Sequence, residues 1–137
     1  MTSVATVVTD ALQLLRVVDA NEAPEAEDMA TGIRALNMMM RVWEVEGPAL
    51  GWSDVAAPGD TLPAPPEAEE AITDNLALRL RARYGAALEP DVLTRAREGL
   101  SMLRSQALTN SYARLSYPDL PEGQGCPGGT WRDGYNC

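Results

Sequence analysis

Apolar residues recur every three or four positions in four stretches of the chain, the spacing that predicts amphipathic helices. The stretches cover residues 4–18, 25–46, 67–86 and 90–111. Acidic residues open the second and third stretches and arginines close the third, an order that suits the dipole of a helix. The pattern therefore predicts an all-α fold with a four-helix domain.

Each predicted helix presents an apolar face to a common core. The first helix is apolar over more than half of its circumference, because Leu12, Leu14 and Val17 lie outside its main stripe, so we expect it to be buried on two sides. Gly99 weakens the fourth helix by about 1 kcal/mol relative to alanine but permits close contact with a neighbouring helix. The residues expected in the core are Val4, Val8, Ala11, Leu15 and Val18; Met29, Ile33, Leu36, Met40 and Trp43; Ala68, Ile72, Leu76, Leu80 and Tyr84; and Val92, Ala96, Leu100, Leu103 and Ala107.

Prolines and glycines interrupt the helical pattern in two places. Residues 48–66 form a proline-rich connector between the second and third helices, and its Pro58-Gly59 pair is compatible with the turn of a short hairpin flanked by Val55 and Leu62. The composition changes again after residue 111, where five glycines, three prolines and four aromatic residues occur. We therefore expect a helical domain at residues 1–111 and an extended C-terminal arm at residues 112–137.

Composition excludes several chemistries. The chain has 20 acidic residues, 11 basic residues that are all arginine, no histidine and a formal net charge of -9. Without histidine there is no Ser-His-Asp triad and no His-ligated metal, and we expect neither a metal nor a cofactor. The acidic balance disfavours binding to DNA phosphates, although such a protein can line a channel through which DNA passes.

Targeting segments and a disulfide framework are also not expected. The N-terminus lacks a basic leader region, and Arg16 and Arg41 break the longest apolar stretches, so neither a signal peptide nor a membrane span is predicted. Cys126 and Cys137 have no metal-binding spacing. Two exposed thiols are expected, with a disulfide between them as the alternative.

The carboxylates and hydroxyls show no motif of an active site. Glu44 and Glu46 point to different sides of their helix, and the acids within residues 67–70 have the character of a solvated first turn. An acid pair for glycoside hydrolysis is therefore disfavoured. The glycines at residues 128–129 lack the lysine of a phosphate loop, and the serines and threonines lack a histidine partner.

The third helix carries three arginines near its end, Arg79, Arg81 and Arg83. They could contact nucleic acid, but their spacing of two spreads them around the helix, and the acids elsewhere in the chain outweigh them. We expect them to form ion pairs within or between subunits instead.

The methionines at residues 38–40 favour a contact with another chain. Consecutive helical residues are rotated by about 100°, so three cannot face one core. Met39 and Met40 are expected inside the domain, whereas Met38 lies on the polar side of the helix. Since methionine is common at contact surfaces, we predict a subunit interface at Met38, Arg41 and Val45, with Leu14 of the first helix as a further candidate.

The C-terminal arm has the composition of a partner-binding segment. A glycine- and proline-rich segment that carries tyrosine and tryptophan is typical of a chain that folds on a partner through aromatic anchors. The alternative is that the arm packs on its own domain.

Several short motifs, taken in order, resemble one known family. They are Ala11-Leu12-Gln13-Leu14-Leu15, Leu36-Asn37-Met38-Met39, Trp43 and Gly47, a proline-bearing loop, Asn75-Leu76-Ala77 and Tyr84-Gly85. Over residues 4–106 this order is similar to the head-to-tail adaptor, or connector, proteins of tailed phages. The closest likeness is to the packaged-DNA stabilisation and tail accessory type of short-tailed phages.

This resemblance implies a structural virion protein of the neck, assembled in the host cytoplasm, and not an enzyme. Such adaptors form a ring, usually of twelve copies, beneath the portal protein. The ring extends the DNA channel without sequence-specific binding, helps to retain the packaged genome and provides a platform for the tail nozzle and other tail proteins. The residues of the arm that would contact the portal are Tyr112, Tyr117, Pro118, Leu120, Trp131 and Tyr135.

Other classes of function remain open. A small helical interaction module, such as a regulator or chaperone that binds one partner through the arm, would be a monomer or dimer. A glycosidase-like enzyme would need a deep pocket with two inward carboxylates. A DNA-binding regulator would need a basic recognition helix.

Overall fold

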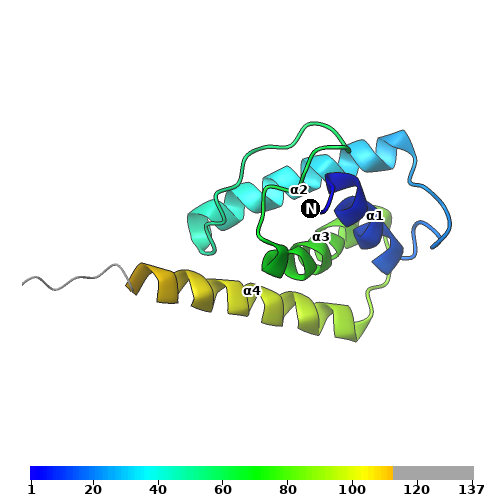
Figure 1. Cartoon of the computed structure of the whole chain (residues 1–137). Helices are drawn as coiled ribbons and strands as arrows, with labels where there is room; N and C mark the ends of the chain where they lie inside the picture. Colours follow the sequence, from blue (N-terminus) through cyan, green and yellow to red (C-terminus); the bar gives the residue numbers. More distant parts are fainter. Residues whose placement is uncertain (113–137) are drawn as a thin grey trace, which may run out of the picture.

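The computed structural model describes the backbone of residues 1–112 and the side chains of residues 1–110. In this part of the chain the regular structure is helical, which confirms the all-α prediction (Figure 1). The elements are α1 (Val4–Leu14), α2 (Ala26–Glu46), the short 3-10 helix η1 (Pro66–Ala68), α3 (Glu69–Tyr84) and α4 (Pro90–Tyr112).

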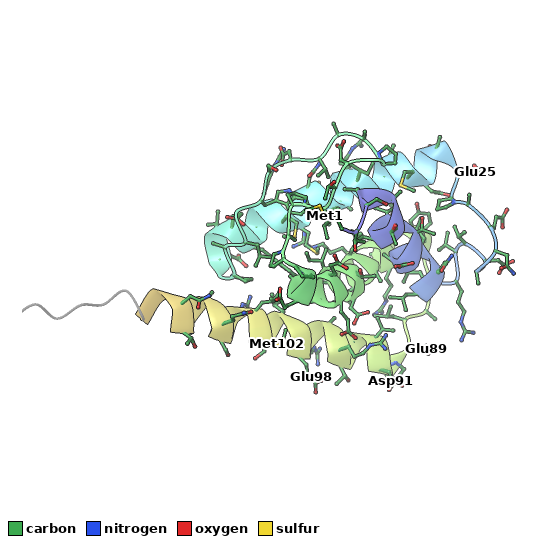
Figure 2. The ribbon with its side chains drawn as sticks, viewed as in Figure 1. Met1, Glu25, Glu89, Asp91, Glu98 and Met102 are labelled. Carbon is green, nitrogen blue, oxygen red and sulfur yellow. The ribbon has the colours of Figure 1, made fainter. Side chains whose placement is uncertain are left out.

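Helix α3 lies at the centre of the domain and packs against α1, α2 and α4. Its long buried face explains why it contacts three partners. Helix α4 runs along the outside, and its C-terminal end projects past the other helices (Figure 1). Asp91 and Glu98 lie on the outer side of α4 and point away from the domain (Figure 2).

The predicted core is largely confirmed. Sixteen of the twenty residues expected inside are buried, and all of these except Val92 and Ala96 of α4 belong, with Met39, to one continuous apolar core. The other four lie near helix ends or along the outer helix α4, where fewer neighbours cover them. These partly buried residues are Met29, Tyr84, Leu100 and Ala107.

The first helix ends earlier than its apolar pattern predicts. Helix α1 stops at Leu14, because Arg16 adopts a left-handed backbone conformation with φ of 55°. Val17 is consequently exposed, whereas Val18 turns back and is buried. Leu12, which lies outside the predicted stripe, is fully buried, so the expected burial of α1 on two sides is confirmed.

The connector does not form a hairpin. Val55 and Leu62 are both buried, but the returning segment bonds to the start of the chain instead of to the outgoing one. Val4 donates its amide to the carbonyl of Asp60 at 2.9 Å, and Leu62 donates to Thr2 at 3.0 Å. The first amides of a helix have no partner within the helix, and the connector supplies acceptors for them.

Two helix contacts are close because one side has no side chain. A Cβ atom on Gly99 would lie 2.8 Å from the Cβ of Ala71, which confirms the close approach expected there. A Cβ atom on Gly32 of α2 would lie 2.3 Å from a methyl group of Val8. At the end of α3, Gly85 adopts a φ of 62°, a conformation that glycine takes without strain.

Candidate assembly surfaces

The outer face of α2 carries exposed apolar side chains. Met38 is 57% exposed and Val45 is 86% exposed, whereas Met39 and Met40 are fully buried. The predicted division of the three methionines is therefore confirmed. We call Met38, Arg41 and Val45 the α2 outer face; their contact with another subunit stays a prediction.

Arg41 of this face is held by the connector. Its Nε donates to Asp54 Oδ1 at 3.1 Å, and its Nη2 donates to Asp54 Oδ2. These hydrogen bonds lower the pKa of the Asp54 carboxyl. Because the guanidinium already has a partner, the apolar side chains on either side of it are the free part of the surface.

Asn37 fastens the connector to α2. Its Nδ2 donates to the carbonyl of Val55 at 2.8 Å, while its Oδ1 accepts from the Val55 amide at 3.1 Å and from Trp52 Nε1 at 3.2 Å. About two turns further on, Glu44 accepts hydrogen bonds from the amides of Leu50 and Trp52. The connector is therefore a shaped part of the domain.

Two more side chains of the recognised motifs join helices. Asn75 donates to the carbonyls of Ala71 at 2.7 Å and of Ala96 at 2.9 Å, which links α3 to α4. Tyr84 donates its hydroxyl to Asp28 at 2.8 Å, which links α3 to α2. Burial, together with this hydrogen bond, raises the pKa of Tyr84 to about 12. The motif residues thus hold the domain together and contain no reactive group.

A pocket of about 500 Å³ lies between α1, α3 and the first turns of α4. We call it the acidic pocket, since its charged lining consists of four carboxylates and one guanidinium. Leu14, one of the predicted interface residues, lines it, but no residue of α2 does. The predicted interface residues therefore lie on two separate surfaces. The charged residues of the pocket are Asp10, Glu69, Glu70, Asp74 and Arg95.

Asp74 is the buried carboxylate of this pocket. The residue is 2% exposed, and its Oδ2 lies 3.3 Å from Arg95 Nε but accepts no hydrogen bond from the described residues. Burial raises the pKa of Asp74, Arg95 opposes this shift and Glu70 adds to it. Burial also raises the pKa of Asp10. Neither aspartate stood out in the sequence, because the pocket forms only where α1, α3 and α4 meet.

Asp74→Asn is expected to stabilise the isolated chain at pH 7 by on the order of 1 kcal/mol, because it removes a poorly solvated charge. A raised carboxyl pKa means that the folded state binds this proton more tightly than the unfolded state. The contribution of protonated Asp74 to the stability of the wild-type chain is therefore lost as the pH rises through the pKa that this carboxyl has in the folded state. The advantage of the variant should be largest at neutral pH and should shrink towards pH 4. Urea unfolding at several pH values measures it; equal or lower stability of the variant at pH 7 would contradict it.

The predicted arm contacts fall outside the described side chains. Tyr112 is the last residue of α4, and its side chain lies beyond them. The two cysteines of the arm also lie outside. The other predicted portal contacts, which also lie outside the described residues, are Tyr117, Pro118, Leu120, Trp131 and Tyr135.

Within the described residues, no group of three or more acidic or cysteine side chains is arranged to hold a metal ion. No helix in the same part of the chain combines the length and the apolar character needed to cross a bilayer.

Comparison with known proteins matches the chain to a family. The model of a family described as "P22 tail accessory factor" matches residues 5–130, which is most of the chain. No curated protein matches the chain.

Proposed function

We propose a neck-ring function for this chain, which belongs to the P22 tail accessory factor family. Family membership makes it a phage tail accessory protein with a structural role in the virion, as the sequence resemblance implied. In our proposal, copies of the chain, twelve in number, form a ring beneath the portal protein. The ring extends the DNA channel, helps to retain the packaged genome and receives the tail nozzle. The family match over residues 5–130 carries this proposal.

The α2 outer face supports a contact between copies. Met38 and Val45 are large apolar side chains on the solvent side of a helix whose opposite side is buried. Apolar groups gathered on a surface mark a site of association. The net charge of -9 suits a ring around DNA, since like charge disfavours contacts with phosphate.

The C-terminal arm is proposed to bind the portal. The chain leaves the helical domain at the projecting end of α4, so the domain and the residues that follow can face different partners (Figure 1). Aromatic side chains are the usual anchors of protein interfaces. The proposed portal contacts are Tyr112, Tyr117, Pro118, Leu120, Trp131 and Tyr135.

Mixing the purified full chain with portal protein tests the proposed function. Electron microscopy of the particles and their mass in solution should show a ring of copies on one end of the portal. A chain that stays monomeric and never binds the portal would overturn the proposal.

Two single substitutions separate the two contacts. Met38→Asp is expected to lower the yield of rings about tenfold, because the contact would bury an unpaired carboxylate. Trp131→Ala is expected to weaken portal binding by a similar factor, because it removes an aromatic anchor. Sedimentation with portal measures both. Ala30→Asp, an exposed change on the same helix, is the control for Met38→Asp. A normal yield of rings with Met38→Asp would show that Met38 lies outside the interface. A loss of helicity in the Met38→Asp monomer would show that Met38 packs in the core instead.

Two alternatives make different predictions. A small regulator or chaperone would bind one partner through the arm as a monomer or dimer, so the mass of the complex distinguishes it from a ring. A glycosidase needs two carboxylates that face a sugar between them. In the acidic pocket the buried carboxylate of Asp74 instead faces the guanidinium of Arg95.

A further inference from the structure

Charge is divided between the two ends of α3. Glu69 and Glu70 lie in its first turn beside the acidic pocket, whereas Arg79, Arg81 and Arg83 follow towards its other end. The helix has 16 residues and is about 24 Å long, so the two ends are well separated. All three arginines are exposed, and within the described residues none forms an ion pair.

The acidic pocket holds more acidic than basic side chains. The side chain of Asp74 is 4% exposed, and within the described residues its Oδ2 pairs with Arg95 alone and accepts no regular hydrogen bond. Arg95 is itself 47% exposed and is one cation against four carboxylates. A guanidinium carries five N–H donors in a planar fork, which suits several carboxylate oxygens at once.

We propose that the acidic pocket receives an arginine from the second half of α3 of a neighbouring copy. Arg79 and Arg83 are the favoured donors, because a spacing of four residues places them on one side of the helix. This inference rests on the proposed ring and adds to it the contact that joins successive copies.

The position of the two partners determines the kind of assembly. Since the pocket borders the first half of α3 and the arginines lie in its second half, each copy would offer its arginines to the next copy and receive those of the previous one. Such a head-to-tail contact generates a ring when the rotation closes. It also lets strongly acidic chains associate, because opposite charges meet where the copies touch.

A second copy is favoured over other cationic partners. Both halves of the contact are present on this chain, and every cation in the sequence is an arginine. Leu14, predicted from the sequence as an interface residue, lines the same pocket. Within the described residues the acids are not arranged to hold a metal ion, which leaves an organic cation as the fitting ligand.

Charge reversal on each side tests the contact. The pocket variant carries Asp10→Arg and Glu70→Arg, and the arginine variant carries Arg79→Glu and Arg83→Glu. Each alone would bring like charges together, so the yield of rings on the portal should fall at least about tenfold. An equal mixture of the two should restore it to within about twofold, because alternating copies again pair opposite charges. Analytical ultracentrifugation with portal protein measures these yields.

Controls separate this contact from folding and from the proposed function. Asp19→Arg with Glu22→Arg makes the same change in charge on the exposed link between α1 and α2, and it should leave ring yield unchanged. Circular dichroism and thermal unfolding verify that each variant folds. If the pocket variant does not fold, a variant with the neutral pair Asp10→Asn and Glu70→Gln replaces it. This neutral variant should also lower the yield of rings.

The outcomes are distinct. Failure of each variant alone together with rescue in the mixture supports the contact. If wild-type rings form and both reversed variants also form them, the inference is overturned while the ring stands. Failure without rescue in the mixture also overturns it. If wild-type chains form no ring on the portal, the proposed function fails, and this inference fails with it.

Discussion

Asn37→Ala should lower the free energy of unfolding by about 3 kcal/mol, the largest loss that we expect from one polar side chain of this domain. The change removes one donor and one acceptor that together make three hydrogen bonds to the connector. The amide and carbonyl of Val55 and the indole N–H of Trp52 would then lack partners. Each unsatisfied group of this kind costs about 1–3 kcal/mol, less where water can reach it.

Chemical denaturation measures this loss, and hydrogen exchange locates it. The amide of Val55 should exchange faster in the variant, whereas amides in the middle of α3 should change only through the lower global stability. Asn110→Ala, on the exposed side of α4, is the matched control and should change stability by less than about 0.5 kcal/mol. A loss below about 1 kcal/mol for Asn37→Ala would show that the connector is held by other contacts.

Gly32→Ala is expected to destabilise the domain by about 2 kcal/mol, although alanine favours a helix by about 1 kcal/mol over glycine. The added Cβ would lie 2.3 Å from a methyl group of Val8, which is fully buried. Valine is branched at Cβ and has few alternative rotamers, so it cannot turn aside within α1. Helices α1 and α2 would have to move apart.

A double-mutant cycle tests this explanation. Val8→Ala in the Gly32→Ala chain removes the overlapping methyl groups, so the two losses should sum to more than the loss of the double variant. Thermal or denaturant unfolding of the four chains gives the coupling. Additive losses would mean that the contact is not what requires glycine at this position.

The helices could be predicted because their causes are local. Helix α2 was expected at residues 25–46 and is observed at Ala26–Glu46, since its apolar spacing and the Gly47 that follows act within a few residues. The exposure of Met38 could be predicted for the same reason, because neighbouring helical residues must point in different directions. The family resemblance, read from motifs in order, agrees with the family match.

The two wrong predictions have different causes. The end of α1 depends on the left-handed conformation of Arg16, which no glycine or proline signals. The hairpin at Pro58-Gly59 is replaced by bonds from the returning segment to the first residues of the chain. Periodicity along one helix carries no information about such bonds.

The sequence by itself determined the helices, the residues of the core, the exposed apolar side chains of α2 and the absence of histidine chemistry. These properties depend on residue types and on separations of a few residues. Only the tertiary structure decided that Asn37 holds the connector and that Asp10 and Asp74 share a pocket with Arg95. Those groups come from segments whose relative position depends on how helices pack, including the close contact at Gly32, and a pattern along the chain does not contain that geometry.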